Sequence, residues 1–146
     1  YLNSEKYEIK HWDLEKPESL RELIARVNRI RRENPALHSD RSLRFYPIDN
    51  PELLCFGKRT EDLSNVIVVA VNLDPHHTQS GWVELPSEEL GLDPQQTFQM
   101  HELLTDARYL WQGKRNYVQL DPNSVPAQIF HVRPRIRREQ DFDYFM

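Results

Sequence analysis

Residues 66–72 read VIVVAVN, a nearly continuous apolar run that is rich in β-branched side chains. A short run of this kind predicts a central strand that is buried on both faces. Turn signals such as Asp49-Asn50-Pro51 and Gly113 separate it from other β-prone segments on either side. Those segments cover residues 43–46, 53–58, 82–85, 97–103, 108–111, 117–120 and 128–132. Short strands at this spacing predict a mainly β chain that folds as an antiparallel β-sandwich.

Residues 17–33 follow a different pattern, because their apolar side chains recur at helical spacing. Pro17 suits the first turn of a helix, and Asn34-Pro35 should end it. The apolar stripe consists of Leu20, Leu23, Ile24, Val27 and Ile30. Burial of such side chains contributes roughly 1.5–3 kcal/mol each, so the stripe needs a partner surface. The sandwich could cover it, but we expect a homodimer that pairs the same stripe of two copies.

The composition is that of an ordinary globular domain. The chain has 146 residues, of which 38% are hydrophobic and 29% charged. Its formal net charge of −4 gives no general attraction for nucleic acid or acidic membranes. Two groups of arginines, within residues 21–32 and 133–138, are interpreted as solvated surface. No apolar run approaches the ~20 residues that span a bilayer.

The ends and the cysteine content suggest where the chain comes from. It begins with Tyr1 rather than Met, so we expect an excised or processed fragment. Cys55 is its one cysteine, which rules out an internal disulfide and fits a reducing cytoplasm.

Two features invite a functional interpretation but favour a structural one. His76 and His77 follow the turn signal Asp74-Pro75, and no cysteine or carboxylate cluster accompanies them at zinc spacing. We therefore expect turn residues there, and no metal or other cofactor. Cys55 lies between apolar strand residues and is interpreted as a buried, inert thiol.

Four aromatic residues could form a platform on which sugar rings stack. Trp82 and Trp111 lie within predicted strands, so the core is the favoured place for them. A carbohydrate-binding sandwich stays open as the alternative function, and exposure of either tryptophan would favour it. The other two residues are Tyr109 and Tyr117.

Several phrases of the sequence resemble one known family. They are SEKYEIKHWD at 4–13, SLRELIARVNRIRRENPAL at 19–37, VNLDPHHTQSGWVELP at 71–86, HELLTDARYLW at 101–111 and DFDYF at 141–145. All of them look like the C-terminal part of the bacterial α-1,4-glucan:maltose-1-phosphate maltosyltransferases, a family of the α-amylase superfamily. The resemblance runs over essentially the whole chain.

The resemblance implies both a fold and an activity for the intact protein. It implies a retaining glycosyltransferase that moves maltosyl from maltose 1-phosphate to an α-1,4-glucan, in glycogen or α-glucan biosynthesis. Retention needs two carboxyl groups about 5 Å apart, and in this superfamily they lie on barrel strands upstream of this chain. We therefore expect no catalytic residue here and no activity of the fragment alone.

The same resemblance assigns parts of the chain. Residues 1–36 would end the (β/α)8 barrel, with the helix as its last helix, while 41–135 would form the C-terminal sandwich and 136–146 a tail. Lys6 and Tyr7 match a family segment that reaches the barrel mouth, which implies that they bind the maltosyl donor. An ammonium and a phenol can both donate hydrogen bonds to sugar or phosphate oxygens.

Overall fold

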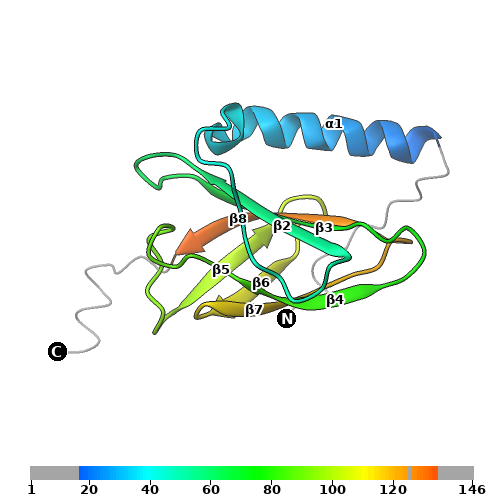
Figure 1. Cartoon of the computed structure of the whole chain (residues 1–146). Coiled ribbons are helices and arrows are strands. Elements are labelled where there is room, and N and C mark those ends of the chain that lie inside the picture. The colour runs from blue at the N-terminus through cyan, green and yellow to red at the C-terminus, as the bar shows by residue number, and fades with distance from the viewer. Residues whose placement is uncertain (1–16, 125, 135–146) are drawn as a thin grey trace.

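The computed structural model describes residues 17–124 and 126–134, which form an antiparallel β-sandwich with a long helix along one side (Figure 1). The mainly β fold and each predicted strand are confirmed. The predicted site loop, within residues 1–16, and the predicted tail, residues 136–146, lie outside the described residues. The elements are α1 (Pro17–Glu33), the 3-10 helix η2 (Pro35–His38), β1 (Arg44–Phe45), β2 (Leu53–Arg59), β3 (Val66–Asn72), β4 (Gln79–Glu84), β5 (Thr97–Glu102), β6 (Arg108–Gln112), β7 (Arg115–Leu120) and β8 (Ala127–Pro134).

The strands form two sheets of unequal size. Sheet A has the strand order β1-β2-β3-β8-β5-β6, and sheet B consists of β4 and β7. All neighbouring strands run antiparallel. The apolar run of β3 lies in the middle of sheet A, paired with β2 on one side and β8 on the other, as its composition predicts.

The main core lies between the two sheets. Alternation along β3 directs Val66, Val68 and Ala70 into this core, and Phe130 of β8 lies opposite Val68. Val83 contributes from sheet B and is fully buried. The inner face of sheet A is therefore covered by sheet B of the same chain.

Helix α1 lies across the outer face of sheet A (Figure 1). Its predicted bounds are confirmed, with Glu18 in the first turn and Arg31 and Arg32 in the last, as the helix dipole favours. Ile67 points away from the inter-sheet core and is nevertheless fully buried. The helix therefore protects a second, smaller apolar layer.

Polar contacts fix the C-terminal half of the helix to the sandwich. Asn34 donates to the Ile30 carbonyl at 2.8 Å and accepts a hydrogen bond from Asn65 at 3.0 Å. The same Asn65 side chain accepts a hydrogen bond from the Ala36 backbone amide at 2.9 Å. Arg26, predicted to be solvated, is half-buried and donates through Nε to the Leu103 carbonyl at 2.8 Å. Both asparagines are buried, so these hydrogen bonds form a structural junction between the helix and the sandwich.

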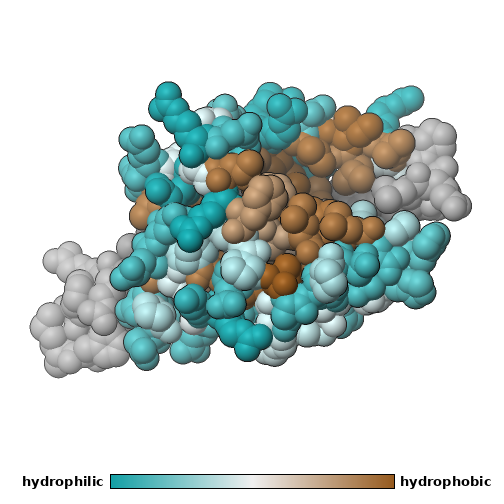
Figure 2. All heavy atoms as spheres, in the orientation of Figure 1, coloured by the Kyte–Doolittle hydropathy of each residue, from teal (hydrophilic) through white to brown (hydrophobic). Residues whose placement is uncertain are grey.

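The apolar stripe of the helix is covered only in part. Ile30 is buried, whereas Leu20 and Ile24 remain 44% and 52% exposed, and Leu23 and Val27 are intermediate. Figure 2 shows apolar residues gathered along the helix and over the neighbouring surface below it. The sandwich therefore buries the stripe near the C-terminal end of the helix and leaves the stripe exposed near the N-terminal end.

Candidate functional site

The two residues predicted to bind the maltosyl donor cannot be placed. Lys6 and Tyr7 lie outside the described residues, and their role stays a prediction.

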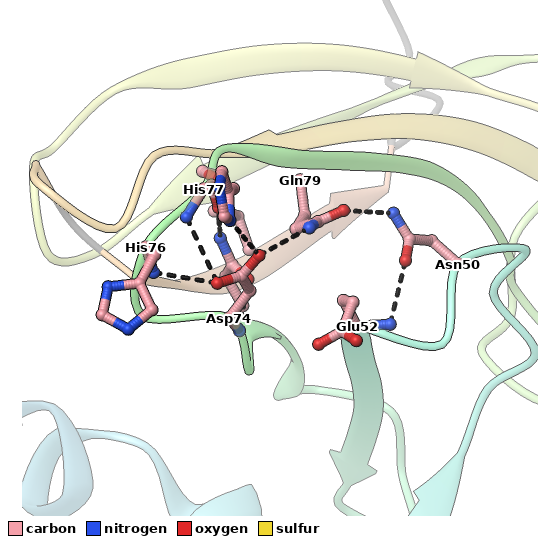
Figure 3. A network of polar contacts seen from close by, with 8 residues as sticks. Asn50, Glu52, Asp74, His76, His77 and Gln79 are labelled. Carbon is pink, nitrogen blue, oxygen red and sulfur yellow. Dashed lines mark hydrogen bonds and ion pairs between the residues drawn. The ribbon is translucent and has the colours of Figure 1, made fainter.

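The turn after β3 is organised by Asp74 (Figure 3). Its Oδ1 accepts hydrogen bonds from the backbone amides of His76 at 2.9 Å and His77 at 3.3 Å. Its Oδ2 accepts one from Gln79 at 2.8 Å and lies 3.0 Å from Nδ1 of His77. The bonds from the His76 amide and from Gln79 are the main reason that the pKa of Asp74 falls to about 2. The turn role predicted for the histidines is confirmed.

The network continues from this turn to the loop before β2. Gln79 accepts a hydrogen bond from Asn50 at 2.9 Å, and Asn50 accepts one from the Glu52 backbone amide at 2.9 Å (Figure 3). Two loops that are distant in sequence are thus braced against each other. Within the described part of the chain, no three His, Cys, Asp or Glu residues form a group that could hold a metal ion.

Glu102 is a buried carboxylate that sequence reasoning missed. It is the last residue of β5, where it follows the buried Phe98 and Met100 in the alternation, and it is completely inaccessible to solvent. Its oxygens accept hydrogen bonds from the amides of Leu104 at 3.1 Å, Thr105 at 2.8 Å and Ile129 at 2.8 Å. The Thr105 hydroxyl donates a fourth at 2.8 Å. A carboxylate with these fixed donors organises the β5–β6 turn and ties it to β8, and it is not free to act as a catalytic acid.

A second polar group lies on the outer face of sheet A. Nε2 of His101 lies 2.5 Å from Oδ1 of Asp106, and this hydrogen bond lowers the pKa of the Asp106 carboxyl. His131 pairs with His101 across β5 and β8, and burial, followed by the charge of Arg133, lowers its pKa. A neutral imidazole is therefore favoured at His131.

Cys55 matches the prediction of an inert thiol. It is 1% exposed within the inter-sheet core, and burial raises its pKa to about 12. A thiol with such a pKa carries almost no thiolate at neutral pH and is a poor nucleophile.

The aromatic residues divide between core and surface. Trp111 is buried, with its ring centroid 5.3 Å from that of Phe130, so its predicted core position is confirmed. The core position predicted for Trp82 is wrong, since its side chain is 44% exposed. In β4 the neighbours Gly81 and Val83 face inward, and alternation therefore turns Trp82 outward.

Trp82 has an exposed aromatic partner on the neighbouring strand. Tyr117 of β7 is directly opposite Trp82 in the register and is 47% exposed. The ring centroids lie 5.5 Å apart, with the planes inclined at 61°. The guanidinium of Arg115 lies 5.5 Å from the Trp82 ring centroid and 3.5 Å from the Asp49 carboxylate. Asp49 in turn accepts a hydrogen bond from the Trp82 amide at 2.7 Å. We call these four residues the aromatic platform, which can bind a ligand but has no evident means of catalysis.

Comparison with a family model identifies most of the sandwich. Residues 45–132 match the model described as "GLGE, C-terminal". The described part of the chain contains no helix long and apolar enough to cross a bilayer.

Named relatives match nearly the whole chain. An alpha-1,4-glucan:maltose-1-phosphate maltosyltransferase of Myxococcus xanthus is 43% identical over 99% of this chain and 22% of its own length. A protein of the same name from Salinibacter ruber is 46% identical over 96% of this chain and 21% of its own length. The chain thus spans about one fifth of the length of these relatives.

Solved structures share the fold at lower identity. An α-amylase of Geobacillus thermoleovorans in complex with acarbose has a TM-score of 0.58 at 18% identity, covering 83% of this chain and 24% of its own. An Anoxybacillus α-amylase has a TM-score of 0.56 at 17% identity, over 84% of this chain and 24% of its own. At this identity the likeness concerns the fold alone.

Proposed function

The chain belongs to the GLGE C-terminal family, and we propose that it is the C-terminal part of a maltosyltransferase that uses maltose 1-phosphate as donor and α-1,4-glucan as acceptor. One observation carries the proposal: 46% identity over 96% of the chain with a relative of that name. The implied reaction is a retaining transfer that releases phosphate and extends a glycogen-like glucan.

Within such an enzyme, we propose a structural role for this part. The sandwich would cover one side of a (β/α)8 barrel, and α1 would be the last helix of that barrel. The open end of the stripe supports this role, because Leu20 and Ile24 present apolar surface on a helix that is already fixed at its other end. A further layer of the longer protein would bury them.

We infer that the chain alone does not catalyse the transfer. The carboxylates with the most specific surroundings, Asp74 and Glu102, are occupied in bracing a turn and a strand junction. Lys6 and Tyr7 would bind the donor only where the rest of the pocket is present. No cofactor is needed for a glycosyl transfer that uses two carboxyl groups.

The remaining assignments follow from charge and surface. A cytoplasmic place fits the phosphorylated sugar donor and the lone, buried cysteine. The net charge of −4 disfavours nucleic acid and acidic membranes as partners. A homodimer of the chain through the open end of the stripe remains our proposal for the fragment.

An assay of phosphate release from maltose 1-phosphate, with glycogen as acceptor, tests the main proposal. The longer protein should release phosphate, and the chain of residues 1–146 should release none. In the longer protein, Lys6→Ala and Tyr7→Ala should each raise the KM for donor by about 3- to 100-fold, the range of one lost hydrogen bond to a charged group or sugar. Turnover by residues 1–146 alone would contradict the inferred inactivity, and unchanged donor kinetics in both variants would remove the role of these residues.

A second candidate function is supported by a specific observation. Exposure of Trp82 favours carbohydrate binding by the sandwich itself. Binding of this kind is compatible with the structural role, because the aromatic platform and the helix lie on opposite layers of the fold.

A further inference from the structure

We propose that the aromatic platform on sheet B is a binding site for an α-1,4-glucan chain, separate from any catalytic pocket. The identity of the glycan rests on the proposed function, whereas the existence of the site rests on the residues themselves. Trp82, Tyr117, Arg115 and Asp49 form it.

The paired rings of Trp82 and Tyr117 leave a large aromatic area open to solvent. Phe, Tyr and Trp each bury roughly 150–250 Å² when they are covered, and that apolar area dominates core and interface energetics. The fold had room for polar residues here, since the flanking outward positions Ser80 and Gln119 are polar and exposed. Trp82 and Tyr117 therefore form an isolated apolar spot with a polar rim, a feature of binding surfaces.

The Trp82 ring lies against two neighbouring side chains, the Tyr117 ring and the Arg115 guanidinium. The Asp49 carboxylate joins the Trp82 amide to the Arg115 guanidinium, at 2.7 and 3.5 Å. The Tyr117 hydroxyl donates to the Gln119 side chain at 3.1 Å. The ion pair with Asp49 therefore orients the Arg115 guanidinium beside the Trp82 ring, which removes part of the ordering cost of binding.

The geometry suits consecutive units of a curved sugar chain. A glucose ring presents C–H groups on its faces and hydroxyls around its edge. Its face can lie on an aromatic ring, while its edge exchanges hydrogen bonds with neighbouring polar groups. Successive units of an α-1,4-glucan are inclined to each other. The planes of the Trp82 and Tyr117 rings are likewise inclined, at 61°. Arg115 supplies donors at the rim, and Asp49 and Gln119 supply acceptors.

Other occupants fit this surface less well. A nucleic acid would meet the Asp49 carboxylate and a chain of net charge −4. A stable protein partner needs an interface of about 1,000 Å² or more, well beyond two rings within a polar rim. A neutral polyhydroxyl chain makes use of every group present.

The platform is also remote from the helix layer. Sheet B lies on the opposite side of the sandwich from α1 (Figure 1). A barrel that buried the exposed end of the helix stripe would therefore lie away from Trp82 and Tyr117. The platform would stay accessible to a polymeric glucan in the longer enzyme.

The test uses the longer protein and compares a polymeric with a short acceptor. Trp82→Ala and Tyr117→Ala should each weaken binding of soluble glycogen about tenfold, measured by retardation in native gels that contain glycogen. The KM for glycogen should rise by a similar factor, while kcat and the KM for maltotetraose stay unchanged. Trp82→Phe should restore most of the glycogen affinity. Leu110→Ala is the matched control, because Leu110 is 74% exposed on sheet A and should leave every readout unchanged.

Glycogen affinity that is unchanged in folded Trp82→Ala and Tyr117→Ala variants would overturn the proposal. An equal loss in Leu110→Ala would do the same. If Trp82→Ala instead lowers the mass of the protein in sedimentation and leaves glycogen affinity intact, the platform is a protein interface and the proposal fails. Gel retardation needs no turnover, so a protein that binds glycogen through the platform but transfers no maltosyl would refute the proposed function alone.

Discussion

The two faces of sheet A are buried to different degrees. On the inner face, Val68 and Met100 are completely inaccessible, and sheet B covers them. On the outer face, Ile67 is equally buried beneath the helix, but Leu20 and Ile24 on the helix itself are about half exposed. The inner face of sheet A is fully buried, whereas the helix layer on the outer face is buried only near the C-terminal end of α1.

The difference indicates which interactions belong to this chain and which it shares. The inner core is closed by strands between residues 44 and 134, so it needs no other part of a longer protein. The helix layer is closed where Asn34 and Asn65 join α1 to the loop before β3, and it opens toward the N-terminal end of α1. We infer that the sandwich is the stable unit and that the helix would attach it to the rest of a longer protein.

The largest expected effect tests the inner face of sheet A. Phe130 is 1% exposed, and its ring centroid lies 5.3 Å from that of Trp111 and 6.0 Å from that of Tyr109. Phe130→Ala should lower the free energy of unfolding by about 3–5 kcal/mol, because it leaves a cavity that the surrounding strands cannot fill. Urea unfolding followed by tryptophan fluorescence would measure it.

The exposed Leu110 provides the comparison for that variant. Leu110→Ala on β6 should change the free energy of unfolding by no more than about 0.5 kcal/mol. A Phe130→Ala variant that is as stable as Leu110→Ala would show that the inner face is not the stable unit.

A smaller effect is expected at the junction between the two layers. Asn65→Ala removes the acceptor of the Ala36 amide and the donor to Asn34, and both partners are buried. The variant should cost about 1–3 kcal/mol, the range for leaving buried polar groups unpaired. Hydrogen exchange should show the loss mainly in α1, with the strands of the sandwich still protected. Ser64→Ala, at the exposed neighbour, is the control, and equal deprotection of β3 would contradict the separation of the layers.

Much of this fold follows from local sequence signals. The run at 66–72 and the helical stripe at 17–33 identify their elements because each has a single dominant periodicity. The bounds of strand β4 follow less clearly from the sequence: the strand begins at Gln79, three residues before the predicted start at 82. Gln79, Ser80 and Gly81 carry no β signal of their own and are strands because they pair with β7.

The site was less predictable than the fold. Glu102 is polar in sequence, and nothing local reveals that donors from β8 and the following turn converge on it. The sequence favours a core position for Trp82, because large aromatic residues in strands are usually buried. The face of the sheet on which Trp82 lies depends on the register of β4. Gly81 and Val83 occupy the inward positions, so a core position for Val83 predicts that Trp82 is exposed.

The smallest effect on stability is expected at the open end of the helix. Leu20 and Ile24 are half exposed already, so Leu20→Gln and Ile24→Gln should each change the free energy of unfolding of the monomer by about 0.5 kcal/mol or less. Gln is a good helix former, which keeps the backbone of α1 in place. Leu23 is half-buried, and Leu23→Asp should destabilise the monomer more than either.

The same substitutions should have a larger effect on the self-association of residues 1–146. This difference distinguishes a surface that binds a second copy from one that only tolerates substitution. A two-fold contact brings the exposed stripe of one copy onto that of another, so residues 1–146 should associate as their concentration rises in sedimentation experiments. Leu20→Gln and Ile24→Gln should weaken this association, whereas Ala25→Gln, at an exposed position off the stripe, should not. In the longer enzyme the barrel would occupy the stripe, and the two variants should lower its thermal stability without changing its oligomeric state. A chain that stays monomeric at high concentration, with α1 intact, would mean that the half-covered stripe is stable in water without a partner. The proposal that α1 attaches the sandwich to a barrel through this open end would then lose its support.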